Sequence, residues 1–236
     1  MGLGNPDPAY RLSTHNVGFE CIQEINLRLN AGAAVDLGSV ILRRGEHAGR
    51  SYVLARPQTW MNASGRGVER LLRYLESDVK DLVVITDDMD LPLGAVRVRP
   101  GGGAGTHRGM QSLVETLGRK DFARIRIGIH PGAPGPVDLA QYVLTPMAGP
   151  ELDVLNTGIT RAAEAALDLL QCKDIDAVMN RTNRRYRRRD GSVVQPNTLF
   201  APPEGGGCRP VSRDGAAHAA SIQKEEECID RMKSGS

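Results

Sequence analysis

The chain has 236 residues, of which 40% are hydrophobic and 25% are charged, and its formal net charge at pH 7 is +2. Such a small net charge provides no global electrostatic attraction to nucleic acid. No apolar run approaches the roughly 18 residues needed to cross a bilayer, which argues against a membrane-spanning helix. The length suits one domain with an additional segment or two small domains.

The cysteines give no sign of a disulfide framework or a metal site. Cys21, Cys172, Cys208 and Cys228 lie far apart and form no Cys-x-x-Cys pair, and no histidine stands at metal-ligand spacing from them. No charged and then apolar leader begins the chain. We therefore expect reduced thiols, no metal, no membrane anchor and a cytoplasmic location.

The first half of the chain predicts a helix, a pair of strands and a second helix. Apolar residues recur at helical spacing through residues 16–30, with polar residues between them. Short apolar runs at 40–42 and 52–55 flank a glycine-containing turn, a pattern typical of paired strands. A second helix is expected from about Ser64, and its apolar face consists of Val68, Leu71, Leu72 and Leu75.

In the second half, predicted strands alternate with predicted helices. Residues 82–85 form a continuous apolar run before Thr-Asp-Asp, as expected of a strand that is buried on both faces and ends at polar residues. Further strands are predicted at 95–99 and 124–129, and helices at 107–117, 150–170 and 175–180. The alternation indicates an α/β fold, which we expect to be a single domain with a twisted, mostly parallel or mixed sheet flanked by helices.

The composition changes near residue 185. Six arginines fall between Arg181 and Arg189, and such a block either contacts phosphates or forms a solvated helix end. Residues 196–236 have no apolar periodicity that could offset the entropy lost on ordering them. We therefore expect a catalytic domain over residues 1–185, followed by a basic linker and a disordered tail over residues 186–236.

Four motifs carry the functional information. They are Gly-Leu-Gly-Asn-Pro at 2–6 followed by His15, Trp-Met-Asn at 60–62, Asp-Asp-Met-Asp-Leu-Pro at 87–92, and Gly-Gly-Gly-Ala-Gly-Thr-His-Arg-Gly at 101–109. Together they resemble the bacterial-type peptidyl-tRNA hydrolase family, over residues 1–185. The resemblance implies a monomeric enzyme without a cofactor that hydrolyses the ester bond between a peptide and tRNA and so recycles tRNA during translation.

The resemblance makes His15 the general base that activates water and Asp87 its carboxylate partner. A histidine suits this task because its ordinary pKa of about 6.5 lies near neutral pH. A carboxylate beside it selects the tautomer and stabilises the imidazolium that forms. Asp88 and Asp90 are adjacent competitors, and spacing alone does not choose among the three aspartates. We expect Asp90 to cap the turn before Leu91.

The same resemblance places Asn5 and Asn62 on the peptide of the substrate, with Met61 beside them and Tyr10 lining the same cleft. A neutral amide can donate to peptide carbonyls and accept from peptide N–H groups at little desolvation cost. Simpler alternatives stay open for both asparagines. Asn5 precedes a proline and suits a turn, while Asn62 suits the N-cap of the helix that begins near Ser64.

Three arginines are candidates for contact with the substrate. By the resemblance, Arg99 and Arg126 meet tRNA phosphates, a task that suits the forked guanidinium, although each also suits an exposed strand position. Arg108 follows His107 where most members of the family have asparagine, and arginine offers no acceptor. We expect Arg108 to reach outward to phosphate, because the positive end of the helix dipole disfavours another cation beside it.

The chain also departs from the family pattern at its start. Asp7 replaces the usual glycine of the first motif, and Thr14 replaces the arginine that commonly precedes the histidine. In the family an apolar central strand precedes this motif, whereas the chain begins at Met1 inside the motif. Either the start lies upstream, or the fold lacks its central strand. The second case would deprive neighbouring strands of ladder hydrogen bonds and core contacts.

Two rival functions are open on the sequence alone. One is a non-catalytic RNA-binding protein on the same fold, as in the organellar intron-splicing relatives of the family. Arg108 and the arginine run are compatible with it, whereas His15 and Asp87 argue against it. The other is a nucleotide-dependent enzyme that uses the loop at 100–105, but this loop lacks the Lys-Ser/Thr pair of a P-loop and the dinucleotide-binding spacing.

Overall fold

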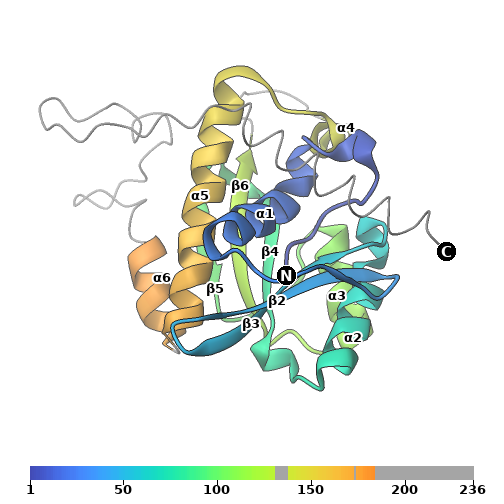
Figure 1. Ribbon diagram of the computed structural model, residues 1–236. Helices are drawn as coiled ribbons and strands as arrows, with labels where there is room; N and C mark the ends of the chain where they lie inside the picture. Colours follow the sequence, from blue (N-terminus) through green and yellow to red (C-terminus); the bar gives the residue numbers. More distant parts are fainter. Residues whose placement is uncertain (131–137, 173, 184–236) are drawn as a thin grey trace, which may run out of the picture. The chain divides into compact units, whose positions relative to one another are not determined.

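Two three-stranded sheets form the centre of the computed structural model, which describes residues 1–130, 138–172 and 174–183 (Figure 1). The first sheet is antiparallel, in the order β1 (Val35–Asp36), β2 (Val40–His47) and β3 (Arg50–Pro57). The second has the order β4 (Val83–Pro92), β6 (Ala123–His130) and β5 (Val96–Arg99). In the second sheet β4 and β6 run parallel, and β5 runs antiparallel to β6.

Residues 1–3 connect the two sheets. The Gly2 amide donates to the Ala55 carbonyl of β3 at 3.1 Å, and the Leu3 amide donates to the Ile85 carbonyl of β4 at 2.9 Å. The Ile85 amide in turn donates to the Met1 carbonyl at 2.8 Å. The expectation of an absent central strand is therefore corrected in part, because these three residues give β3 and β4 backbone partners at that position.

Helices cover both faces of the second sheet (Figure 1). They are α1 (Val17–Leu29), α5 (Gly149–Gln171) and α6 (Ile175–Asn183) on one face, and α2 (Ser64–Leu75) and α3 (Arg108–Leu117) on the other. Each face of the sheet has its own hydrophobic core. Successive side chains of a strand point to opposite faces, so Ile85 packs in the core formed with α1, α5 and α6, and Val84 packs in the core formed with α2 and α3. The α/β fold with helices on both faces is thereby confirmed.

The start of α1 packs closely on the central strands. A Cβ atom at Gly18 would lie 2.4 Å from the Leu3 carbonyl oxygen and 2.6 Å from that of Ile85, so only glycine allows this approach. The short 3-10 helices η1 (Pro8–Tyr10) and η2 (Thr14–Asn16) lead into α1. The close packing therefore brings η2 next to the end of β4.

Most of the regular segments follow the sequence predictions, although β2 and β3 are longer than the predicted runs. The sequence did not predict β1 or the short helix α4 (Leu139–Leu144). β4 is also longer than predicted, because its pairing with β6 continues through Asp88 opposite Gly128 to Pro92 opposite His130. The aspartates that were expected to follow the strand thus lie within it.

The C-terminal predictions fall mostly outside the described residues. Of the arginine run, the structure describes Arg181, which pairs with Asp168 at 3.2 Å, and the tail beyond residue 183 is not described. Cys21 and Cys172 are free thiols. Among the described residues, none of the helices has the length and apolar character required to span a membrane.

Candidate active site

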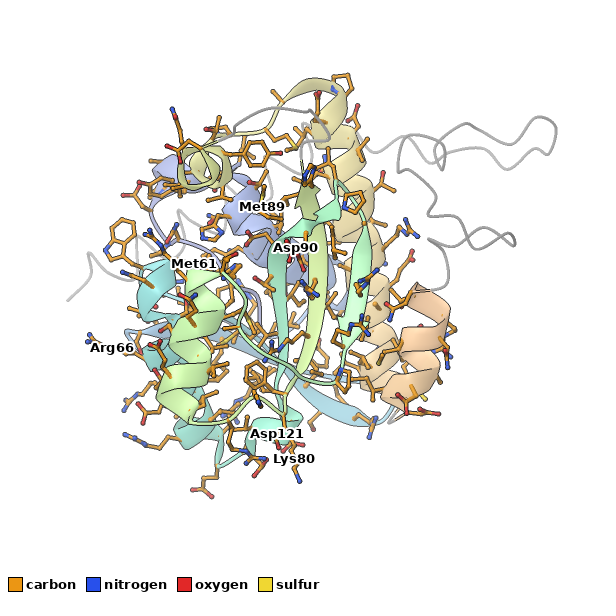
Figure 2. All side chains as sticks on the ribbon, turned by 180° about the vertical axis from the view of Figure 1, so that it is seen from behind. Met61, Arg66, Lys80, Met89, Asp90 and Asp121 are labelled. Atoms are coloured by element: carbon orange, nitrogen blue, oxygen red, sulfur yellow. The ribbon has the colours of Figure 1, made fainter. Side chains whose placement is uncertain are left out.

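A cleft of about 730 Å³ opens towards the carboxyl ends of β4 and β6. Figure 2 shows Met89 and Asp90 at this end of β4, with Lys80 and Asp121 at the opposite end. The cleft is also lined by η3 (Met61–Ala63), the glycine-rich loop at 101–106 and α4. It brings together all the site residues predicted from the sequence, namely Asn5, Tyr10, His15, Met61, Asn62, Asp87, Arg99, Arg108 and Arg126.

Two imidazoles converge on one buried carboxylate in this cleft. Nδ1 of His15 lies 3.0 Å from each carboxylate oxygen of Asp87. Nε2 of His107 lies 2.8 Å from Oδ1 of Asp87 and 2.7 Å from the Thr86 hydroxyl. Asp87 is 4% exposed, and the two ring centroids are 4.9 Å apart.

The hydrogen bonds assign the tautomers of both rings. His107 is the N-cap residue of α3, and its Nδ1 accepts the backbone N–H of Met110 at 3.2 Å. An N–H only donates, so the proton of the neutral His107 ring sits on Nε2 and is donated to Asp87. An ionised Asp87 only accepts, so Nδ1 of His15 is also a donor. Nε2 of His15 then carries a lone pair, and it makes no hydrogen bond within the described residues.

Electrostatics keep this carboxylate ionised. Burial raises the pKa of Asp87, but His107 and His15 lower it more, and the pKa lies well below its ordinary value. Burial lowers the pKa of His107, whereas the charge of Asp87 and its hydrogen bond raise it, so that the pKa is raised on balance. A proton on Nδ1 of His107 would face the Met110 N–H, so the helix cap opposes protonation.

Asp88 and Asp90, the competitors of Asp87, have a different partner. Asp88 forms an ion pair with Nε of Arg126, and Asp90 lies 3.8 Å from Nη2 of the same arginine. The expectation that Asp90 caps the turn is wrong. Its backbone N–H donates to Oδ1 of Asp88 at 2.9 Å, because an Asx side chain bonds the backbone two residues ahead. Burial raises the pKa of Asp88 despite the opposing effect of Arg126.

Asn5 joins the first two motifs. Its Oδ1 accepts the Met61 backbone N–H at 2.8 Å, and its own backbone is held by the Asn16 side chain through two hydrogen bonds. Nδ2 of Asn5 makes no hydrogen bond within the described part of the chain, although the residue lines the cleft. Asn62 is exposed in η3 and is not the helix cap, because α2 begins at Ser64 after Ala63.

An aromatic pair stands at one edge of the cleft. The rings of Tyr10 and Trp60 meet edge to face, with centroids 6.2 Å apart. Trp60 is 55% exposed. This edge therefore offers a large apolar surface beside Asn62. Trp60 lies within a predicted motif but was not among the predicted site residues.

Basic side chains line another part of the cleft. Arg99 and Arg108 are exposed, and neither forms an ion pair within residues that the structure describes. Arg99 pairs in register with Arg124 across β5 and β6, so both side chains share one face of the sheet. Arg124, which was not among the predicted site residues, also lines the cleft, where it is buried and bonded to the glycine-rich loop.

The missed role of His107 has a simple cause. The sequence places His107 within the glycine-rich motif but twenty residues from Asp87, and no local spacing rule connects the two. The residues preferred at helix N-caps are Ser, Thr, Asp, Asn and Gly, so a histidine before the helix gives no cap signal in the sequence. Its contact with Asp87 arises only when α3 packs beside β4.

The two histidines and Asp87 also have spacing that a metal could use. Their ligand atoms lie within 4.8 Å of one another, the one such group in the described part of the chain. Both nitrogens that face Asp87 carry protons in the tautomers assigned from the hydrogen bonds, whereas metal ligation requires them unprotonated. Moving the His107 proton to Nδ1 would oppose the Met110 N–H. The donor set therefore suits hydrogen bonding better than metal binding.

Comparison with known proteins assigns the family. A family model described as Peptidyl-tRNA hydrolase matches residues 1–190. The chain belongs to the peptidyl-tRNA hydrolase family. The peptidyl-tRNA hydrolase of Halalkalibacterium halodurans is 40% identical over 183 residues, covering 78% of this chain and 98% of the relative. The peptidyl-tRNA hydrolase of Roseiflexus castenholzii is 38% identical over 212 residues, covering 88% of this chain and 98% of the relative.

Solved structures agree with this assignment. The crystal structure of peptidyl-tRNA hydrolase from Acinetobacter baumannii has a TM-score of 0.70 and 29% identity to the chain, covering 77% of it and 92% of that structure. Membership of the peptidyl-tRNA hydrolase family confirms the predicted activity, which is hydrolysis of the ester bond of peptidyl-tRNA. Neither rival function from the sequence analysis is supported.

Proposed function

We propose that His15 is the general base of peptidyl-tRNA hydrolysis. The observation that carries this proposal is the His15–Asp87 pair, which leaves Nε2 of His15 without a hydrogen bond among the described residues and so able to take a proton from water. The water oxygen attacks the ester carbonyl carbon. The bond from that carbon to the ribose oxygen then breaks, and the proton passes from His15 to the leaving oxygen.

Asp87 stabilises the imidazolium that forms at His15 during this step. Its two oxygens lie equally close to Nδ1 of His15, so the ring keeps the tautomer in which Nε2 is unprotonated. His107 acts on Asp87 rather than on substrate, because its Nε2 donates to Oδ1 of Asp87. We regard His107 as a positioning residue for that carboxylate.

The peptide of the substrate binds beside Asn5 and Asn62. The Oδ1 atom of Asn5 is committed to Met61, so Nδ2 is the group available to donate to a peptide carbonyl. Asn62 keeps both its donor and its acceptor for the peptide. Met61 and Tyr10 supply apolar surface next to these amides.

The tRNA phosphates meet Arg99, Arg126 and Arg108. Arg126 forms an ion pair with Asp88 and lies 3.8 Å from Asp90. Arg99 and Arg108 form no ion pair among the described residues, so they contribute the stronger attraction. All the residues given roles here belong to one chain, and water activated by His15 supplies the chemistry, so the proposed mechanism requires neither a second subunit nor a cofactor. Because the substrate arises from translation, we propose a cytoplasmic location.

Turnover of N-acetyl-aminoacyl-tRNA tests the role of His15. His15→Ala should reduce kcat by roughly 10²–10⁴-fold, the usual contribution of a general base, and leave tRNA affinity nearly unchanged. His47→Ala is the matched control, because His47 lies on β2 and does not line the cleft. Activity of His15→Ala within about threefold of the parent enzyme would contradict the assignment.

A further inference from the structure

Arg124 of β6 is the one fully buried arginine among the described residues, with 5% of its surface exposed. Its guanidinium forms no ion pair with a carboxylate in the described part of the chain. Burial lowers the pKa of this guanidinium, and the neighbouring charge of Arg126 lowers it further. A buried charge is costly unless other groups compensate it, so the partners of Arg124 indicate why an arginine stands here.

Those partners are carbonyl oxygens of the glycine-rich loop. Nη1 of Arg124 donates to the Gly103 carbonyl, and Nη2 donates to the Gly102 carbonyl. Nη2 also lies 3.5 Å from the Lys120 carbonyl, and the guanidinium carbon lies 4.7 Å from the centre of the Phe122 ring. Two successive carbonyls require two donors at a fixed separation, which the guanidinium fork provides and a lysine ammonium does not.

Apart from Arg124, the Gln111 side chain is the other side-chain donor to this loop among the described residues, and its Nε2 donates to the Gly105 carbonyl at 3.0 Å. Gly102 has φ +139, a conformation that favours glycine, and its N–H donates to the Lys120 carbonyl at 3.0 Å. A Cβ atom at Gly103 or Gly105 would meet nothing within 4 Å. The loop then leads into Thr106 and His107, so its conformation determines where α3 begins.

We propose that Arg124 is a positioning residue for peptidyl-tRNA hydrolysis, which holds the glycine-rich loop as a wall of the cleft and fixes the start of α3, where His107 meets Asp87. The guanidinium acts through the loop backbone and does not touch the substrate. This inference rests on the cleft as the substrate site, but it does not depend on which residue is the general base.

The competing role is direct contact with a tRNA phosphate, since Arg124 shares a sheet face with Arg99 and lines the cleft. Two observations favour the loop. Both Nη groups are already bonded to carbonyls of the loop. Nε is the donor that has no partner among the described residues, but it is buried and therefore not accessible to a phosphate. A phosphate would have to displace the loop to reach the guanidinium.

Two variants of Arg124 separate these roles. Arg124→Met removes the charge and all donors, whereas Arg124→Lys keeps the charge and loses the fork. Arg66→Met is the neutral control, because Arg66 lies on the exposed surface of α2, away from the loop (Figure 2). Arg99→Met is the comparison for a phosphate contact. The measurements are amide hydrogen exchange, KM and kcat for N-acetyl-aminoacyl-tRNA, and the dependence of KM on salt.

We expect Arg124→Met to accelerate exchange in residues 101–110 but not in α5, because the loop loses its anchor while the core is unchanged. The fraction of enzyme with a formed cleft wall should fall, which raises KM by roughly tenfold. Arg124→Lys should give an intermediate KM, since an ammonium reaches one carbonyl. The slope of log KM against log salt should match that of the parent enzyme, unlike the slope of Arg99→Met.

Three results would overturn the inference. If Arg124→Met lowered the salt slope as Arg99→Met does, Arg124 would contact phosphate directly. Unchanged exchange in residues 101–110 would show that the loop does not depend on this side chain. A KM for Arg124→Lys equal to that of the parent would show that charge alone suffices. Arg124→Lys keeps the inference testable even if Arg124→Met does not fold. His15→Ala should keep the parent rate of amide exchange in residues 101–110, so the role of Arg124 in the loop is tested separately from the role of His15 as general base.

Discussion

At the residue scale, two imidazole N–H groups donate to the carboxylate of Asp87, and this determines which nitrogen of His15 is free to accept a proton. A carboxylate has no proton to give, so each ring must turn a donor towards it, and His15 is left with an unprotonated Nε2. Asp88, one residue along, is committed to Arg126 and to the backbone of Asp90. The choice among three neighbouring aspartates thus follows from which partners they contact.

Asp87→Asn is expected to lower kcat by roughly 10²–10⁴-fold, because an amide can donate to His15 and favour the wrong tautomer. Asp90→Asn is the matched control and should have far less effect, because Asp90 is 92% exposed. Equal losses in the two folded variants would show that the wrong carboxylate has been chosen.

The lowered pKa of Asp87 also makes its contribution to stability depend on pH. The ordinary pKa of an unfolded aspartate is about 3.9, and the folded value is lower, so this contribution is complete above about pH 4 and is lost as the pH falls further. The difference in free energy of unfolding between the parent and Asp87→Asn should therefore shrink in acid. Urea unfolding at a series of pH values measures it.

Arg108 is exposed at the start of α3 and forms no ion pair among the described residues. Arg108→Asn should raise KM for full-length tRNA substrates with kcat little changed, and the salt dependence of KM should weaken by about one phosphate contact. An N-blocked aminoacyl-adenosine, which lacks the tRNA body, serves as control and should be unaffected. A changed kcat with an unaltered KM at low salt would place Arg108 among the catalytic groups.

At the scale of elements, α3 couples helix formation to the active site through one side chain. His107 caps the helix through Nδ1 and holds Asp87 through Nε2. The helix ends at Gly118, whose φ of +62 suits a left-handed C-terminal cap. The position of α3 and the orientation of the carboxylate therefore depend on the same residue.

His107→Asn separates these two roles. Asparagine is a favourable N-cap residue, so the melting temperature should stay within about 4 °C of the parent value. The side chain is too short to reach Asp87, so kcat should fall by roughly tenfold. His107→Leu loses both interactions and should lower stability and kcat together. Unchanged kcat in His107→Asn would mean that Asp87 needs no second donor.

At the scale of the whole molecule, the cleft draws on segments from Asn5 to Leu144. The docking of α4 illustrates this: the Thr14 hydroxyl donates to the Val143 carbonyl at 3.3 Å, next to His15. Thr14 is 1% exposed, so the residue that replaces the usual arginine fills a buried contact instead. The boundary proposed near residue 185 rests on sequence composition and lies outside the described residues.

Removal of residues 195–236 tests that boundary. The segment has too few apolar residues to contribute to a core, so the shortened chain should keep the melting temperature and the turnover of the full chain. Differential scanning fluorimetry and the N-acetyl-aminoacyl-tRNA assay measure the two properties. A fall of more than about 4 °C, which corresponds to roughly 1 kcal/mol in a domain of this size, would contradict it.

The sequence by itself determined the α/β class and most helices and strands, which follow from local periodicity. The resemblance of its four motifs to the peptidyl-tRNA hydrolase family made His15 and Asp87 a candidate pair, although they lie 72 residues apart in the chain. Only the tertiary structure decided that Met1 to Leu3 fill the central position, that Asp88 rather than Asp90 caps the turn, and that His107 shares Asp87. It also decided that Arg124 holds the glycine-rich loop. In each case a side chain or backbone group has several possible partners, and packing of the helices and strands selects one of them.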